Sequence, residues 1–202
     1  EGVYSRHLKR TFDILVVLLA SPFVLLLVLG FALAVRRDGG PAFYLQDRIG
    51  KNGRIFRIWK LRSMVTDADT RLAAHLEANP DARAEWDHHQ KLKDDPRITK
   101  VGRLIRKTSL DELPQLWNVL TGDMSLVGPR PMMPAQAPLY PGQAYYRLRP
   151  GLTGYWQISS RNESSFAERA GFDSRYAAEL SLRTDVRVLF STVRVVLRGT
   201  GY

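Results

Sequence analysis

Two adjacent carboxylates, Asp111 and Glu112, have the setting in this 202-residue chain that best suits phosphate chemistry. They follow Ser109 at a predicted helix start, where exposed backbone N–H groups and the helix dipole favour anions. A structural interpretation fits equally, because Ser109 and Glu112 have the spacing of a capping box. Pro114 leaves open which residue begins the helix. In a helix that begins at Leu110, the Pro114 ring would clash with the Leu110 carbonyl, whereas a helix capped by Asp111 would have Pro114 in its first turn. Spacing alone therefore does not decide between catalysis and capping.

Three arginines are candidates for binding phosphate. Arg130 lies in Gly-Pro-Arg-Pro after a short strand-like run, a stiff loop on which its planar guanidinium can bind phosphate through two hydrogen bonds. Arg147 and Arg149 precede the turn at Pro150-Gly151, and an extended stretch would point both side chains the same way. Solvated arginines in an ordinary turn explain this second pattern equally well.

The longest apolar run, Ile14 to Val35, contains no charged residue and is long enough as a helix to cross a hydrocarbon core of roughly 30 Å. Basic residues flank it on both sides: Arg6, Lys9 and Arg10 before it, and Arg36 and Arg37 after it. Basic flanks favour the cytoplasmic side, so both ends are expected on the same face of the membrane.

Ser21 and Pro22 interrupt this run. Proline removes a helical donor, and the Ser21 hydroxyl can bond the carbonyl that is freed. We therefore favour a re-entrant helical hairpin broken at Ser21-Pro22 over two alternatives, a kinked transmembrane helix and a buried core helix.

The rest of the chain is expected to mix short strands with helices. Segments 42–46 and 55–59 alternate apolar and polar residues around a turn at 50–53, which predicts a β-hairpin. Residues 67–93 have helical spacing and divide into two pieces at Asn79-Pro80. Segments 97–107 and 186–198 each carry an apolar helix face with basic residues around it, which is typical of a helix in the membrane interface or of a core-facing helix.

These elements predict an α+β protein that is monotopic, with an N-terminal re-entrant helical hairpin, interfacial amphipathic helices and a small β-hairpin. Residues 1–40 are expected to form the membrane-inserted part, and residues 41–202 a catalytic domain on the cytoplasmic face. The chain starts at Glu1 rather than at a methionine, which leaves a preceding region open.

Composition limits the chemistry. The chain has no cysteine, which excludes disulfides, thiolate zinc sites and cysteine nucleophiles, and its four histidines have no zinc spacing. The formal net charge of +10 indicates anionic partners: nucleic acid, lipid headgroups or phosphorylated substrates. The long uncharged run argues against nucleic acid.

Four motifs, in order, resemble the bacterial sugar transferase family, the monotopic polyprenyl-phosphate phosphoglycosyl transferases. They are Lys60-Leu61-Arg62-Ser63-Met64, Arg106-Lys107-Thr108-Ser109-Leu110-Asp111-Glu112-Leu113-Pro114-Gln115-Leu116, Gly128-Pro129-Arg130-Pro131 and Arg149-Pro150-Gly151-Leu152-Thr153-Gly154. The resemblance runs from about Lys9 to the C-terminus. Arg161-Asn162 and residues 198–202 make the chain most similar to the galactose- or glucose-phosphate transferases that initiate exopolysaccharide synthesis.

The resemblance implies a two-step transfer on the cytoplasmic face of the bacterial inner membrane. Asp111 would attack the sugar-bearing phosphorus of a UDP-sugar, UMP would leave, and undecaprenyl phosphate would take the phosphosugar from the carboxylate. Mg²⁺ held by Asp111 and Glu112 would offset the crowding of negative charge. Membrane lipids are expected partners, nucleic acid is not, and a homodimer is compatible with the sequence.

The resemblance also implies roles for further residues. Glu112 would orient the metal or the lipid phosphate. Arg130 and Pro131 would shape the nucleotide site. Asp173 and Asp185 would support the arrangement of the site, although each fits a helix N-cap equally well. The residues expected to bind phosphate groups are Lys60, Arg106, Arg147 and Arg149.

Two departures from the family pattern stand out, and three other functions stay open. Ser160 stands where glycine is expected, and residues 67–93 are longer than in the smallest members. A basic nucleic-acid-binding protein would bind DNA in a salt-dependent way. A membrane scaffold would tolerate Asp111→Asn, and a membrane phosphatase or other aspartyl-phosphate hydrolase would release free sugar phosphate without lipid. The motifs do not encode the donor sugar.

Overall fold

The computed structural model describes Tyr4 and residues 8–89, 92–159 and 166–197, and it mixes helices with two small sheets, as expected. The first half contains α1 (Lys9–Arg36), β1 (Phe43–Ile49), η2 (Lys51–Gly53), β2 (Ile55–Leu61), α2 (Ala68–Ala78), α3 (Pro80–His89) and α4 (Lys100–Lys107). The second half contains η3 (Leu110–Gln115), α5 (Leu116–Thr121), β3 (Ser125–Val127), η4 (Pro134–Leu139), α6 (Ala144–Arg147), β4 (Gly151–Thr153), α7 (Tyr155–Ile158), α8 (Arg169–Glu179) and α9 (Leu182–Leu197).

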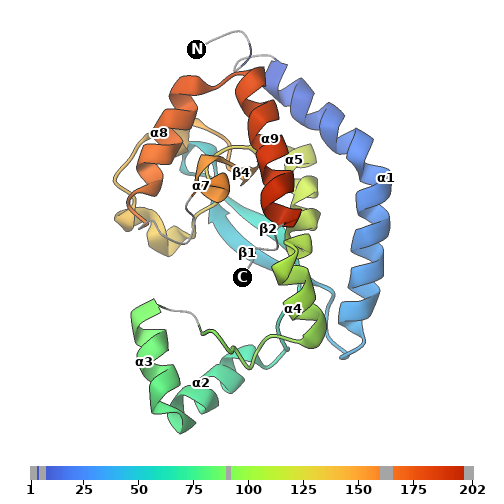
Figure 1. Ribbon diagram of the computed structural model, residues 1–202, viewed down its shortest axis with the longest axis vertical. Coiled ribbons are helices and arrows are strands. Elements are labelled where there is room, and N and C mark those ends of the chain that lie inside the picture. The colour runs from blue at the N-terminus through green and yellow to red at the C-terminus, as the bar shows by residue number, and fades with distance from the viewer. Residues whose placement is uncertain (1–3, 5–7, 90–91, 160–165, 198–202) are drawn as a thin grey trace.

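The predicted hairpin and the predicted helix break are both confirmed. Strands β1 and β2 pair antiparallel from Phe43–Leu61 to Ile49–Ile55, and the turn between them uses Asn52 and Gly53 with positive φ. Helices α2 and α3 meet at Asn79, whose side chain accepts a hydrogen bond from the Ala82 N–H at 3.1 Å. In Figure 1 these two helices form an arm that extends from the main body.

The short parallel pair β3–β4 joins two of the four motifs. Ser125 pairs with Gly151 and Val127 with Thr153. A Cβ atom on Gly151 would fall 2.1 Å from the Gly128 nitrogen, so only glycine allows this approach. The loop that carries Arg130 is thereby fixed against the segment that follows Arg149.

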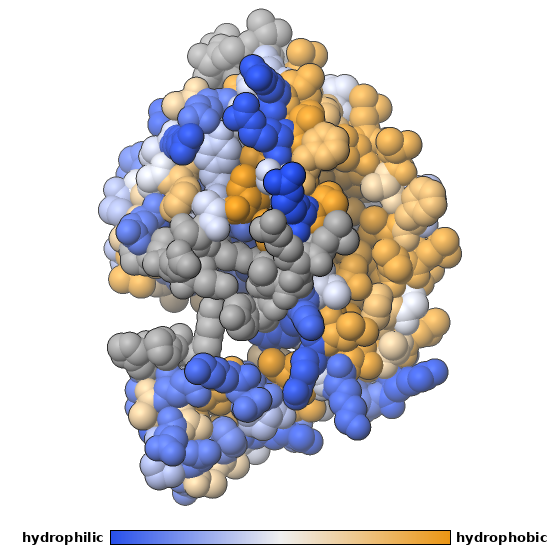
Figure 2. All heavy atoms as spheres, in the orientation of Figure 1, coloured by the Kyte–Doolittle hydropathy of each residue, from blue (hydrophilic) through white to orange (hydrophobic). Residues whose placement is uncertain are grey.

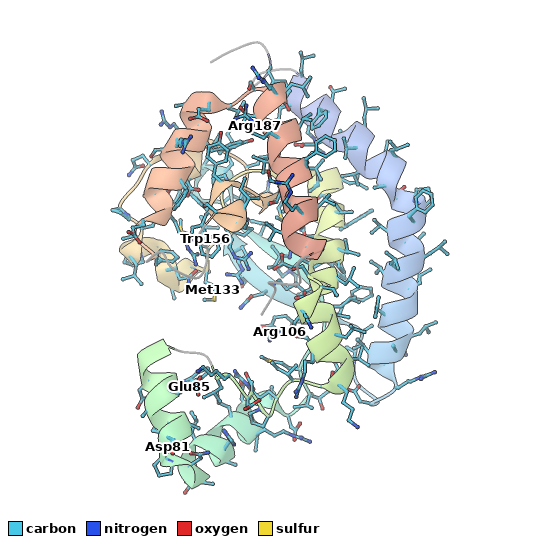
Figure 3. All side chains as sticks on the ribbon, viewed as in Figure 1. Asp81, Glu85, Arg106, Met133, Trp156 and Arg187 are labelled. Atoms are coloured by element: carbon cyan, nitrogen blue, oxygen red, sulfur yellow. The ribbon has the colours of Figure 1, made fainter. Side chains whose placement is uncertain are left out.

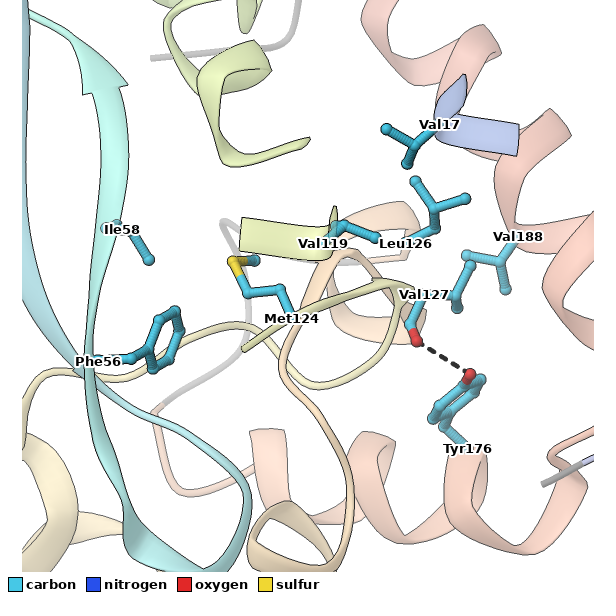
Figure 4. Packing of buried hydrophobic residues seen from close by; sticks show 9 residues of the cluster. All are labelled: Val17, Phe56, Ile58, Val119, Met124, Leu126, Val127, Tyr176 and Val188. Carbon is cyan, nitrogen blue, oxygen red and sulfur yellow. Dashed lines mark hydrogen bonds between the residues drawn. The ribbon is translucent and has the colours of Figure 1, made fainter. Parts of the chain in front are cut away.

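One apolar core connects elements from the whole chain. Figure 4 shows its buried side chains, with the Tyr176 hydroxyl donating to the Val127 carbonyl at 3.1 Å. The cluster draws on α1, β2, α5, β3, α8 and α9, and consists of Val17, Phe56, Ile58, Val119, Met124, Leu126, Val127, Tyr176 and Val188. Because Val17 of α1 belongs to it, the start of α1 packs as part of the body. The division of the chain at residue 40 stays a prediction.

Helix α1 corrects the expectation of a helical hairpin. Residues Lys9–Arg36 form one continuous helix of 28 residues with Pro22 inside it, and Figure 1 shows that the helix bends without turning back on itself. The Ser21 hydroxyl donates to the Leu18 carbonyl at 2.8 Å. In an uninterrupted helix residue 22 would donate to this carbonyl, but Pro22 has no N–H group. The expected bond from Ser21 is therefore present, and it helps to keep the helix intact through the proline.

Both ends of α1 are bound to the same folded body. Near its start, Lys9 pairs with Asp185 of α9 at 2.6 Å. Near its end, Arg62, which follows β2, donates to the Val35 carbonyl and pairs with Asp38 at 2.5 Å. A straight helix of this length would measure about 42 Å, so the body lies alongside the helix rather than at one end of it.

The outer side of α1 is a large apolar surface. Leu19, Phe23 and Leu26 are 72–80% exposed, and Figure 2 shows apolar side chains gathered over this side of the molecule. Among the described residues, α1 alone is a helix long and apolar enough to cross a membrane. Soluble monomers rarely expose so much contiguous apolar surface, so this side fits contact with a membrane.

The two amphipathic helices face both the core and the surface. In α4, Ile105 is buried while Leu104 is exposed, and in α9, Val188 is buried while Phe190 is exposed. The two readings of these helices from sequence, interfacial and core-facing, thus apply to different residues of the same helix.

Candidate active site

The carboxylates lie on a short 3-10 helix, η3, rather than on the first turn of an α-helix. Ser109 precedes it in the left-handed conformation, with φ 56°, and its carbonyl accepts a hydrogen bond from the Glu112 N–H at 3.2 Å. In the described structure, no side chain of Ser109 caps this helix, so the capping-box interpretation is wrong. The tight 3-10 geometry accommodates Pro114 inside η3 and presents Asp111 and Glu112 at its start.

Lys60 and Arg130 approach the two carboxylates from separate elements. Lys60, on β2, places its Nζ 2.8 Å from Glu112 Oε1 and 3.9 Å from Asp111 Oδ2. Arg130, on the loop after β3, places a guanidinium nitrogen 3.4 Å from the same Glu112 oxygen. Glu112 is thus held between two cations, whereas Lys60 is farther from Asp111 than from Glu112.

This difference gives the two carboxyl groups opposite acidities. Burial and the neighbouring Glu112 raise the pKa of Asp111 to about 6, against the lowering effect of Lys60 and Arg106. Burial also opposes the ionisation of Glu112, but Lys60 and Arg130 outweigh it and lower the pKa of Glu112 to about 2. Glu112 is therefore a fixed anion, and Asp111 is a carboxylate whose charge is poorly compensated at neutral pH.

Asn118, which was not identified from the sequence, binds the backbone of the strand that carries Lys60. Asn118, 2% exposed on α5, accepts from the Trp59 N–H at 3.1 Å and donates to the Arg57 carbonyl at 2.8 Å. Because α5 follows η3 directly, these bonds tie the strand that carries Lys60 to the helix that carries the carboxylates. In the sequence, this residue could have been noticed as a single amide side chain within the largely apolar segment Leu116–Thr121.

The other predicted basic residues are distributed more widely. Arg106 lies in the last turn of α4 (Figure 3), and its charge lowers the pKa of Asp111. Arg147 ends α6 and lines a surface pocket beside Asn52 and Gly53. Arg149 donates instead to the Gly122 carbonyl at 2.9 Å. The extended stretch expected across Arg147 and Arg149 is interrupted by α6, so the structure does not bring these two side chains together; their phosphate-binding role stays a prediction.

The two supporting aspartates are buried, and neither is an N-cap. Asp173 lies inside α8, accepts from the Tyr140 hydroxyl at 2.8 Å, and has its pKa raised to about 6 by burial. Asp185 is 0% exposed inside α9 and accepts hydrogen bonds from Lys9 and from the Tyr176 hydroxyl. Asp185 therefore ties α1 to the C-terminal helices. Pro131 continues the rigid Arg130 loop into buried Met132.

The residues present fit the expected Mg²⁺. The described residues contain no group of three or more side chains of the kinds that bind metals. Mg²⁺ is commonly bound by one or two carboxylates together with substrate phosphates and water, and Asp111 and Glu112 offer such a pair. The poorly compensated charge of Asp111 is consistent with a further cation near it.

Comparison with known proteins matches the chain to one family. The model of the family described as "Bacterial sugar transferase" matches residues 4–199. The chain is 50% identical to "Undecaprenyl-phosphate galactose phosphotransferase" of Salmonella typhimurium and 49% identical to "UDP-galactose-lipid carrier transferase" of Erwinia amylovora, over 98% of this chain and 42% of each relative. It is 47% identical to "Exopolysaccharide production protein ExoY" of Sinorhizobium fredii, over 96% of this chain and 87% of that protein. The chain thus spans less than half the length of the first two relatives.

Proposed function

Because the chain belongs to the bacterial sugar transferase family, we propose that it transfers a sugar phosphate from a UDP-sugar to undecaprenyl phosphate and so initiates polysaccharide synthesis. The observation that carries this proposal is the difference in pKa between Asp111, at about 6, and Glu112, at about 2, with Lys60 paired to Glu112. A nucleophilic carboxylate must be ionised but weakly stabilised, and Asp111 meets both conditions above about pH 6.

In the first step, an Asp111 oxygen forms a bond to the sugar-bearing phosphorus, and the bond from that phosphorus to the bridging oxygen breaks. The electron pair leaves with UMP, and the phosphosugar remains on Asp111. In the second step, an oxygen of undecaprenyl phosphate attacks the same phosphorus and releases the Asp111 carboxylate. Splitting the transfer in this way replaces one displacement between two anions by two easier ones.

The neighbouring residues have distinct parts in this scheme. Glu112 is fixed by Lys60 and Arg130, so it serves as an anchor rather than as the nucleophile. Lys60 and Arg106 present positive charge to the transferred phosphoryl group. Mg²⁺, when bound by Asp111 and Glu112, would supply further charge neutralisation for the diphosphate.

The fold supports a membrane position in which both ends of α1 lie on one face of the membrane. A body that holds both ends of α1 would need to lie on both sides of the membrane if the helix crossed it, so we place the helix within one leaflet. The basic flanks of α1 favour the cytoplasmic face. Leu110 of η3 packs with Ala32 and Val35 near the end of α1, so the carboxylates lie beside the membrane segment where a lipid phosphate arrives.

A turnover assay tests the proposal. Detergent-solubilised protein is incubated with Mg²⁺, undecaprenyl phosphate and a panel of UDP-sugars, and UMP and lipid product are measured beside Asp111→Asn. We expect UMP release with at least one sugar, matched by lipid product and lost in the variant. UMP without lipid product would indicate a hydrolase, and equal turnover by Asp111→Asn would reject the proposed nucleophile.

A further inference from the structure

Three arginines from distant parts of the sequence converge beside the carboxylates. Arg48 lies on β1, Arg130 follows β3, and Arg169 begins α8. Arg130 and Arg169 lie over the same indole ring of Trp156, at 5.8 Å and 4.0 Å from its centre, and the charge of Arg48 acts on both arginines. Because Arg130 also contacts Glu112, this cluster adjoins the proposed nucleophile.

Among the described residues, two carboxylates, Glu112 and Asp173, act on these three arginines. Within the described part of the chain, the buried Nε atoms of Arg48 and Arg169 have no hydrogen-bond partner. A guanidinium nitrogen of Arg48 reaches the Gln46 side-chain oxygen, which is neutral. The nearby Asp173 already accepts from Tyr140, and Glu112 is shared with Lys60.

Mutual repulsion is the physical consequence. Burial and the charge of Arg130 lower the pKa of Arg48, and burial, Arg130 and Arg48 together lower the pKa of Arg169 to about 10. A purely structural role for Arg169, stacked on Trp156 and Phe166, would not require two further guanidinium groups nearby. A bound anion would remove the repulsion and supply the missing hydrogen-bond acceptors.

A narrow hollow of about 10 Å³, space for about one water molecule, lies among side chains of the cluster. Arg130, Arg169 and Asp173 line it together with aromatic side chains that include Tyr145 and Trp156. Figure 3 shows Trp156 far from the apolar outer side of α1. The two arginines over Trp156 therefore lie away from the side of the molecule that fits contact with lipid.

We propose that Arg48 and Arg169, together with Arg130, bind the nucleotide phosphate of the donor, the group that leaves as UMP. The assignment rests on the proposed function. As the bridging bond breaks, this phosphate gains negative charge, and preorganised guanidinium groups stabilise charge that develops in the transition state. Because Arg130 also contacts Glu112 at 3.4 Å, a phosphate bound by the cluster would lie next to the two carboxylates.

Calorimetric titration of UMP into the solubilised protein tests the assignment without turnover. We expect Arg48→Gln and Arg169→Gln each to weaken UMP binding about tenfold or more, the effect of losing charged hydrogen bonds. Arg175→Gln is the matched control, because Arg175 lies on the same helix as Arg169, is 70% exposed in its side chain and pairs with Glu179. Arg169→Lys should bind with intermediate affinity, since it keeps the charge but loses the planar fork.

Two results would overturn the assignment: UMP affinity that is equal in Arg48→Gln, Arg169→Gln and Arg175→Gln, or an unaltered protein that binds no UMP. Thermal unfolding midpoints close to that of the unaltered protein show that each variant has folded. Failure here is distinct from failure of the proposed function, because full turnover by Asp111→Asn would reject the nucleophile while leaving an arginine-dependent UMP site intact.

Discussion

At the residue scale, the pair Asp111 and Glu112 shows how neighbours in sequence acquire different chemistry. Both are partly buried, but Lys60 lies 2.8 Å from Glu112 and 3.9 Å from Asp111. Glu112 therefore remains ionised, whereas the charge of Asp111 is poorly compensated. Adjacent carboxylates were visible in the sequence, whereas this asymmetry depends on Lys60 and Arg130, which come from other elements.

The first prediction concerns the pH dependence of turnover. Asp111 must be ionised to attack, and its pKa is raised to about 6, so kcat/KM should rise as pH increases through about 6. Lys60 lowers this pKa, so Lys60→Met should move the acidic limb to higher pH whatever the loss in absolute rate. Profiles of UMP release against pH provide the measurement, with exposed Lys51→Met as the control. If the acidic limb of the profile lies at the same pH in Lys60→Met and in the unaltered protein, Lys60 does not lower the pKa of Asp111.

A second prediction concerns Asn118. Replacing it by alanine leaves the Trp59 N–H and the Arg57 carbonyl without their partner, which should cost about 2–4 kcal/mol of stability. Thermal unfolding in detergent measures the loss, and Thr108→Ala, which removes a hydroxyl bonded within its own turn, is the control. An Asn118→Ala midpoint equal to that of the control would show that β2 does not depend on this amide. The sequence indicated a polar residue in an apolar helix, but not the strand that it binds.

At the scale of elements, the local breakers were predictable and the path of the chain between them was not. The turn at Asn52-Gly53 and the break at Asn79-Pro80 follow from backbone preferences of the residues themselves. The continuity of α1 through Pro22 depends on the Ser21 bond and on both ends packing against one body. The 3-10 form of η3 likewise depends on the left-handed Ser109, which no spacing pattern indicates.

The third prediction tests the position of α1. The chain contains no cysteine, so single cysteines can be introduced without background. Leu8→Cys and Arg37→Cys, at exposed positions flanking the helix, should react with a membrane-impermeant reagent from the same side of sealed vesicles. Leu26→Cys, 72% exposed on the outer side of the helix, should be protected by lipid and serves as the control. Labelling of the two flanks from opposite sides would contradict a position with both ends of α1 on one face of the membrane.

At the scale of the whole molecule, the fold separates an apolar surface from a cluster of arginines. The apolar side of α1 fits contact with lipid, and Trp156, over which two of the arginines lie, is away from it (Figures 2 and 3). Arg48 and Arg169 are more than a hundred residues apart in the sequence, so no local pattern could predict their meeting. The motifs indicated the site because they carry Lys60, Asp111 and Arg130; the residues between motifs that complete it required the three-dimensional structure.

In the proposed reaction, Asp111 carries the phosphosugar between donor and acceptor. Intact-protein mass spectrometry after rapid mixing with UDP-sugar and Mg²⁺, without undecaprenyl phosphate, measures this directly. We expect the mass to increase by one phosphosugar, with the addition on the peptide that contains Asp111 and its loss when undecaprenyl phosphate is added. Asp69→Asn, at an exposed position, should behave like the unaltered protein, and Asp111→Asn should gain no mass. A protein that turns over fully yet never carries the added mass would show direct transfer and contradict the account.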